Sequence, residues 1–278
     1  MPTRGILSAA VLAGATLMCS ALAEPQPVDA ALRTDLRQIG TQRIFFAHQS
    51  VGMNLLDGLR QLSGAADVVI RIEPAVNAGS VPQQSLGHAF IAQNGKPLLK
   101  LGDFRRALES KPNAVDIALL KFCYLDFAMD TDVKALFEHY RETISALQKI
   151  NPRTTFVHVT VPLTVPQAGV KGLAKRLLRI PPYGIVENVR REEYNALLRR
   201  TYAGREPLFD LARVEATAPD GRTSAVEWQG SVVPMLTPAY TDDSSHLNAT
   251  GSVRAARELV RVLAAAGHAR ASSLARSK

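Results

Sequence analysis

Arg43-Ile-Phe-Phe-Ala-His-Gln-Ser50-Val-Gly-Met-Asn-Leu-Leu-Asp-Gly58 combines an apolar run, a turn that carries one serine, and the start of a helical pattern. The unbroken apolar run at 44–47 is typical of a strand that is covered on both faces. After Ser50, apolar residues recur at helical spacing, namely Val51, Leu55, Leu59 and Leu62. We therefore predict that Ser50 lies where a strand ends and a helix begins. Open α/β sheets bind ligands at such points, and free helix N–H groups favour negative charge there.

A serine in this position has two interpretations. It can be a helix N-cap, which is a common role for serine, or it can be a reactive group. A second motif bears on the choice. In Tyr240-Thr-Asp-Asp-Ser-Ser-His246-Leu-Asn, Asp243 precedes His246 by three residues, directly before another amphipathic helix.

Strand patterns and helix patterns alternate along the chain. The predicted strands are 43–48, 67–72, 117–122, 155–161 and 207–211, and the predicted helices are 51–62, 104–109, 132–150, 189–202 and 250–266. This alternation predicts a single three-layer α/β/α domain around a five-stranded parallel sheet. Two long segments rich in proline and glycine, 74–102 and 163–186, are expected to cross the surface and shape a cleft.

The N-terminus has the pattern of a secretory signal peptide. Arg4 is followed by an uncharged, largely apolar run at 6–22, which ends in small residues, and we expect cleavage after Ala23. The run is short for a membrane span. An alternative is a lipoprotein modified at Cys19. The pattern predicts a secreted or periplasmic protein that does not span a membrane.

The predicted boundaries are a signal peptide at 1–23, a lead-in at 24–40, the α/β domain at 41–267 and a disordered tail at 268–278. After cleavage only Cys123 remains, so an internal disulfide is excluded.

The chain is basic, with 33 Lys and Arg against 25 Asp and Glu, a formal net charge of +8. The basic residues concentrate at 171–205 and 254–278. Neither segment has the aromatic-interleaved pattern of nucleic-acid-binding modules, so no nucleic-acid partner is predicted. The alternatives are a solvated basic face or a weak attraction to anionic polysaccharide or a membrane surface.

Ser50, Asp243 and His246 are the residue types of a nucleophilic triad. A serine hydroxyl needs a base to remove its proton, imidazole titrates near neutral pH, and a carboxylate holds the imidazole in the required tautomer. Asp242 could replace Asp243, but it is one residue out of the i, i+3 register. The alternative for the second motif is a capping aspartate beside a surface histidine.

These two motifs resemble those of the SGNH (GDSL-type) hydrolase superfamily. Ser50 matches the first block, and Asp243-Ser-Ser-His246 matches the last, so the resemblance extends over roughly residues 41–266. It implies an α/β/α hydrolase with Ser50 as nucleophile, His246 as base and Asp243 as the residue that orients it. The first block departs from the family, because His48-Gln49-Ser50 stands where Gly-Asp-Ser is usual.

The middle blocks of the family, which supply the oxyanion hole, also depart. The resemblance implies that the Ser50 N–H is one donor and that a glycine after strand two is another. Gly79 is the expected match, with Gly87 and Gly95 as alternatives.

The family's Gly-x-Asn-Asp after strand three is absent, since this strand continues as Lys121-Phe-Cys-Tyr-Leu-Asp126. Tyr124 or a backbone N–H near Cys123 would have to replace the asparagine. Loss of one such donor costs roughly 3 kcal/mol of transition-state stabilisation.

Two further residues are candidates. Asp210, at the end of a predicted strand, could orient His246 or bind substrate, or it could cap a helix. His48 could contact substrate or be a hydrogen-bonded strand residue. The spacing typical of zinc sites is absent, and no metal or organic cofactor is implied.

The expected function is that of an exported serine esterase that removes an acyl group, such as acetyl, from a carbohydrate or small ester. The alternatives are an acyltransferase that uses the same three residues with a sugar hydroxyl as acceptor, and a non-catalytic envelope polysaccharide-binding or assembly protein that keeps the fold. The missing Gly-x-Asn-Asp motif favours the last.

Overall fold

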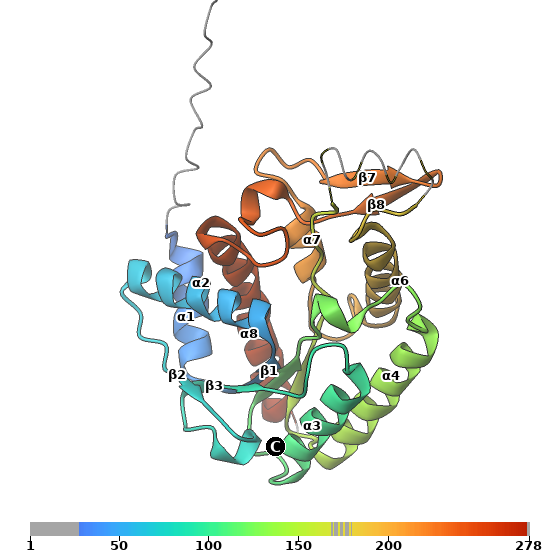
Figure 1. The fold of residues 1–278 in the computed structure, drawn as a ribbon. Helices are drawn as coiled ribbons and strands as arrows, with labels where there is room; N and C mark the ends of the chain where they lie inside the picture. The colour runs from blue at the N-terminus through green and yellow to red at the C-terminus, as the bar shows by residue number, and fades with distance from the viewer. Residues whose placement is uncertain are drawn as a thin grey trace, which may run out of the picture.

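A six-stranded parallel sheet, in the order β2-β3-β1-β4-β5-β6, runs through the computed structural model (Figure 1). The structure describes residues 28–167, 169, 172, 175, 178 and 180–276. The strands are β1 (Arg43–His48), β2 (Ile72–Pro74), β3 (Ser85–Phe90), β4 (Ile117–Leu120), β5 (Thr155–Val159) and β6 (Leu208–Phe209). The predicted α/β class with a parallel sheet is confirmed, with six strands instead of five.

Helices cover both faces of this sheet, as Figure 1 shows. One face carries α1 (Ala30–Gly40), α2 (Ser50–Ala66) and α8 (Ala249–Arg276). The other carries α3 (Pro97–Glu109), α4 (Val133–Ile150) and α6 (Ile185–Tyr202). The shorter elements are α7 (Leu211–Ala216) and three 3₁₀ turns, η1 (Ala78–Ser80), η2 (Tyr124–Asp126) and η3 (Pro238–Tyr240).

The apolar side chains of β1 pack into two hydrophobic cores, one on each face of the sheet. Ile44 and Phe46 pack with α1, α2 and α8, whereas Phe45 and Ala47 pack with α3 and α4. All four are buried, because successive side chains of a strand point to opposite faces. This is why the run is unbroken rather than alternating.

The sheet reverses its strand order at β1. The chain passes from β1 through α2 to β2 and β3, so that β3 lies beside β1, and then crosses to β4 on the other side of β1. Such a reversal leaves a crevice at the carboxyl ends of the neighbouring strands, where α/β proteins bind ligands. Ser50 follows β1 at this point.

The prediction of a strand at 67–72 is wrong for most of this segment. Its β-branched residues suggested a strand, but Val69 is 87% exposed and only Ile72 begins the short strand β2. The strand beside β1 is instead β3, inside the segment 74–102 that was expected to be a loop. Gly87 and the small side chains of β3 have little strand propensity, so the sequence pattern does not reveal this strand. Glycine is needed at position 87 because a Cβ there would lie 2.5 Å from Val81.

Both ends of the domain are more helical than the sequence predicts. The lead-in, for which the sequence predicts one helical turn at 28–36, contains the longer helix α1, whose buried Leu32, Leu36 and Ile39 join the core with α8. At the other end α8 continues to Arg276, so residues 268–276 are helical rather than a disordered tail. Arg270 helps to hold this extension, because it pairs with Asp116 at 2.6 Å and donates to the Arg153 carbonyl at 2.9 Å.

The predicted signal peptide and parts of the second long segment lie outside the described residues. Within the described ranges, no helix is both long and apolar enough to cross a membrane. Residues 225–234 form a hairpin of β7 (Ala225–Trp228) and β8 (Ser231–Pro234). Its turn residues Gln229 and Gly230 both have positive φ, as the preferred two-residue hairpin turns require.

Helices α2 and α8 are in close contact at Gly58. A Cβ there would lie 2.2 Å from the carbonyl oxygen of Ser252, a backbone atom that cannot turn away. We expect Gly58→Ala to force the helices apart and lower the free energy of unfolding by about 1–3 kcal/mol or more. Urea denaturation measures this loss.

Gly64 is the matched control, since it lies on the same helix and a Cβ there meets nothing within 4 Å. Alanine is the better helix former, so Gly64→Ala should raise stability by about 0.5–1 kcal/mol. Equal effects of the two substitutions would contradict the close approach.

Candidate active site

Ser50 is the first residue of α2, and the N-cap position belongs to Gln49. The serine side chain is therefore not the N-cap, which removes the first of its two interpretations. Its Oγ instead lies 3.0 Å from Nε2 of His246, a residue nearly 200 positions away in the chain. The backbone N–H of Ser50 belongs to the first turn of the helix, where N–H groups have no intrahelical acceptor.

His246 and Asp243 are joined through the short loop before α8. Nδ1 of His246 lies 2.6 Å from Oδ2 of Asp243, and Oδ1 accepts the backbone N–H of His246 at 2.7 Å. Between them Ser244 has φ +74, which turns the backbone so that one carboxylate reaches both groups. The Ser244 carbonyl accepts the N–H of Val165 at 2.8 Å, so the loop after β5 supports this turn.

The charge state of Asp243 follows from these contacts. Partial burial alone would raise the pKa of the Asp243 carboxyl. Hydrogen bonds from the His246 N–H, the His246 ring and the Ser245 N–H outweigh burial and hold that pKa well below its usual range. A carboxylate facing Nδ1 leaves Nε2 as the acceptor towards Ser50.

The predicted oxyanion residues divide into two groups. Tyr124 lies at the site, with its ring edge-to-face against His246 and 5.8 Å between ring centroids. Gly79 does not lie there, which corrects the prediction. Its carbonyl accepts a bond from Arg43, the first residue of β1, whereas Ser50 follows the last residue of that strand.

The alternative donors are engaged as well. Gly87 lies within β3 and pairs with Phe45. Gly95 N–H donates to Asp126 Oδ1 at 2.8 Å, and Cys123 N–H donates to Asp126 Oδ2 at 2.7 Å. These N–H groups already have carboxylate acceptors, so they are not available to a substrate oxygen.

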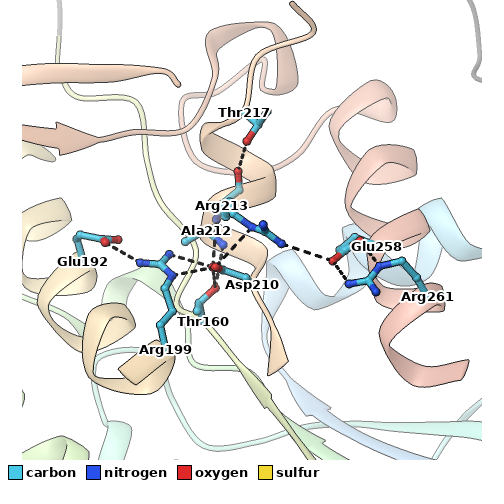
Figure 2. A network of polar contacts seen from close by, with 9 residues as sticks. All are labelled: Thr160, Glu192, Arg199, Asp210, Ala212, Arg213, Thr217, Glu258 and Arg261. Carbon is cyan, nitrogen blue, oxygen red and sulfur yellow. Dashed lines mark hydrogen bonds and ion pairs between the residues drawn. The ribbon is translucent and has the colours of Figure 1, made fainter. Parts of the chain in front are cut away.

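Asp210 lies in a different network, shown in Figure 2. Arg199 binds its carboxylate in a bidentate manner at 2.8 and 2.9 Å, Thr160 donates to it at 3.2 Å, and it caps α7 through Arg213 N–H. His246 is not among the contacts of Asp210 in the described chain. The helix-capping alternative for Asp210 is the one that the geometry supports.

Asp242 and His48 also bind residues other than Ser50 and His246. Asp242 accepts a bond from Asn248 at 3.3 Å rather than from His246. His48 is fully buried, with Nε2 3.1 Å from Nδ1 of His88 and Nδ1 2.9 Å from the Gln49 carbonyl. Burial is the main cause that lowers the pKa of His48 to about 3, so this ring stays neutral and structural.

Four residues that the sequence did not single out connect the loops around Ser50. The Gln49 side chain donates to the carbonyls of Ile91 and Ala92, directly after β3. Lys100 pairs with Asp126 at 2.7 Å, with both side chains fully buried, and also donates to Asn94. Lysine and aspartate at apolar-flanked positions are a weak signal, because surface helices contain many of them.

The described ranges contain no group of three or more His, Cys, Asp or Glu side chains arranged to hold a metal ion. The site consists of a serine at a helix N-terminus, an imidazole and a carboxylate, on a parallel α/β/α sheet. This arrangement agrees with the resemblance that the two motifs suggested.

No family model and no curated protein matches the sequence. Among solved structures, one similar chain is a putative platelet activating factor from Streptococcus pneumonia, which is 17% identical to this chain. The match covers 84% of this chain and 91% of that chain, with a TM-score of 0.48. A G-D-S-L family protein from Desulfitobacterium hafniense is 12% identical, with 79% and 99% covered and TM-score 0.42. The lipopolysaccharide acetyltransferase periplasmic domain of Salmonella ser. Paratyphi A is 15% identical, with 84% and 89% covered and TM-score 0.43.

The chain is thus similar to GDSL-type proteins in its structure as well as in its two motifs. The identities to the three chains are low, at 12–17%. Because the likenesses are distant, the fold rests on the strand order of the sheet, and the chemistry rests on the contacts of Ser50.

Proposed function

We propose that this protein is an exported serine esterase that removes an acyl group, such as acetyl, from a carbohydrate or small ester. The observation that carries this proposal is the unbroken chain of contacts from Asp243 through His246 to Ser50, at 2.6 and 3.0 Å. Export rests on the signal-peptide pattern at 1–23, and the catalytic unit is the domain 41–267 together with the helical segments that extend it.

The chemistry follows from these contacts. Ser50 Oγ attacks the ester carbonyl carbon while its proton moves to Nε2 of His246, and Asp243 stabilises the imidazolium. The tetrahedral intermediate collapses as the imidazolium gives its proton to the leaving alkoxide, which leaves an acyl group on Ser50. His246 then takes a proton from water, which attacks the acyl carbon, and returns this proton to Ser50 Oγ as the bond to the acyl group breaks and the free acid leaves.

The exposure of the site favours hydrolysis over transfer to a sugar acceptor. The side chains of His246 and Asp243 are 37% and 53% exposed, so water has direct access to the base. Transfer to a sugar hydroxyl requires that the acceptor displace this water. Product analysis with and without a sugar acceptor separates the two reactions.

Fluorophosphonate labelling followed by peptide mapping tests the proposal. The probe needs only an activated serine and an oxyanion-stabilising site, and no knowledge of the substrate. We expect one adduct, on Ser50, that disappears in His246→Ala. A folded protein that forms no adduct would contradict the esterase proposal, and it would favour a binding or assembly role on the same fold.

A further inference from the structure

The site lacks the asparagine donor that GDSL-type proteins carry after the strand corresponding to β4. The backbone cannot readily replace it there, because the Cys123 N–H is held by Asp126. The Tyr124 ring packs edge-to-face against the His246 ring, with 5.8 Å between the ring centroids, so Tyr124 contacts the base rather than replacing the asparagine. The Ser50 N–H would then be a lone donor, and a single hydrogen bond leaves a developing oxyanion poorly stabilised.

Asn94, in the loop that follows β3, has an unused donor group. Its Oδ1 accepts a hydrogen bond from Nζ of Lys100 at 3.0 Å, and this is the only hydrogen bond of the Asn94 side chain within the described residues. A lysine ammonium can only donate, so the oxygen of the amide must face it. Neither N–H of Nδ2 donates to a residue that the structure describes, and Asn94 is exposed.

The loop that carries Asn94 is attached on both sides to the elements around Ser50. On one side Gln49, the residue before Ser50, donates to the carbonyls of Ile91 and Ala92. On the other side the Gly95 N–H donates to Asp126 at 2.8 Å. Asp126 ends the 3₁₀ turn that begins with Tyr124, whose ring lies against His246.

The ion pair beneath Asn94 makes it a preorganised donor. Lys100 and Asp126 have fully buried side chains 2.7 Å apart, so the ammonium that fixes the Asn94 oxygen has little freedom to move. A cation on the oxygen of an amide also withdraws electron density from its nitrogen, which strengthens the Nδ2 hydrogen bonds. A fixed and polarised donor is what oxyanion stabilisation requires.

We propose that Nδ2 of Asn94 is the second oxyanion donor of this site, beside the Ser50 N–H. As Ser50 Oγ bonds to the carbonyl carbon, the π electrons move onto the carbonyl oxygen, and Asn94 donates to that oxygen while His246 holds the serine proton. Collapse of the intermediate re-forms the C=O bond and expels the alkoxide. This inference rests on the proposed esterase function, and it assigns to the loop after β3 a role that the family's pattern gives to the loop after β4.

The test compares Asn94→Ala and Asn94→Asp with the neighbouring variant Gln93→Ala in the full chain. Gln93 is exposed on the same loop, and its side chain forms no hydrogen bond or ion pair within the described residues. Rates of fluorophosphonate labelling, and kcat and KM for p-nitrophenyl acetate, are measured for each protein. Urea denaturation reports whether each variant is folded.

For Asn94→Ala we expect kcat and the labelling rate to fall by ~10²–10³-fold with KM nearly unchanged, because the donor acts on the transition state. Asn94→Asp should remain as stable as wild type, since its carboxylate can pair with Lys100, and yet lose at least as much activity. Gln93→Ala should stay within about threefold of wild type.

A purely structural role for Asn94 predicts the opposite ranking, in which Asn94→Asp retains activity along with stability. That result, or an Asn94→Ala rate within about threefold of wild type, would overturn the inference and leave the Ser50 esterase proposal intact. A wild-type protein that forms no Ser50 adduct would overturn both.

Discussion

Replacing Ser50 or His246 by alanine is expected to lower esterase kcat by roughly 10⁴–10⁶-fold, because each substitution interrupts the same proton-transfer unit. The 3.0 Å contact between Ser50 Oγ and His246 Nε2 is lost in either case. The two losses should not add in the double variant, since neither group activates anything without the other. Hydrolysis of p-nitrophenyl acetate and the labelling rate measure the effect.

A smaller loss is expected for Asp243→Asn. Its carboxylate orients the His246 ring from 2.6 Å, but its side chain is 53% exposed, so water can partly replace the lost charge. A buried triad aspartate costs about 10⁴-fold when it is changed to asparagine, and we expect less than that here.

Asp242→Asn is the matched control, because Asp242 is the adjacent carboxylate and contacts Asn248 instead of the imidazole. It should leave kcat within about twofold of wild type. Equal losses in the Asp242 and Asp243 variants would contradict the assignment of the orienting carboxylate.

Lys100→Met is expected to be the most damaging change to stability, by about 3–5 kcal/mol. Lys100 and Asp126 form an ion pair at 2.7 Å with both side chains fully buried, and removal of the cation leaves an uncompensated carboxylate in the interior. The same carboxylate accepts the N–H groups of Gly95 and Cys123, so the loops after β3 and β4 should loosen together. Urea denaturation at neutral pH measures the loss.

Arg105→Met on the same helix is the control. Arg105 pairs with Glu109 but is 54% exposed, and such surface pairs contribute about 0.3–0.5 kcal/mol. A second variant, Lys100→Met with Asp126→Asn, removes the unpaired charge and keeps one carbonyl oxygen that can accept one of the two N–H groups, so it should recover part of the stability. A Lys100→Met loss no larger than that of Arg105→Met would contradict the buried pair.

The sequence predicted those helices and strands correctly in which the local hydrophobic pattern agrees with the burial of the side chains. β1, α2 and α4 combine good periodicity with full burial, and all three lie where the sequence predicted them. β3 was missed because Gly87 and small side chains carry little strand propensity, and its pairing with β1 supplies the stability instead. The segment 67–72 failed for the opposite reason, since its β-branched residues have no strand partner before Ile72.

The candidate site divided in the same way. The sequence singled out Ser50, Asp243 and His246 because each stands at a boundary between clearly marked elements, and the structure brings their side chains together. The Gly79 assignment was wrong because the strand β3 was missed. Gly79 precedes β3, whereas the loop near Ser50 is the one that follows β3. Asn94, Gln49 and Lys100 carry no signal of their own, since their roles arise only from the partners that the fold brings to them.

By itself, the sequence determined the α/β class, the position of Ser50 between a strand and a helix, and the short-range pairing of Asp243 with His246. These features depend on hydrophobic periodicity and on contacts within a few residues, which a linear pattern contains. Only the tertiary structure decided that His246 faces Ser50, that Asp210 belongs to another network, and that a buried ion pair supports the Asn94 loop. Such contacts join distant segments, and their energy depends on burial and on the crossover at β1, which no local pattern specifies.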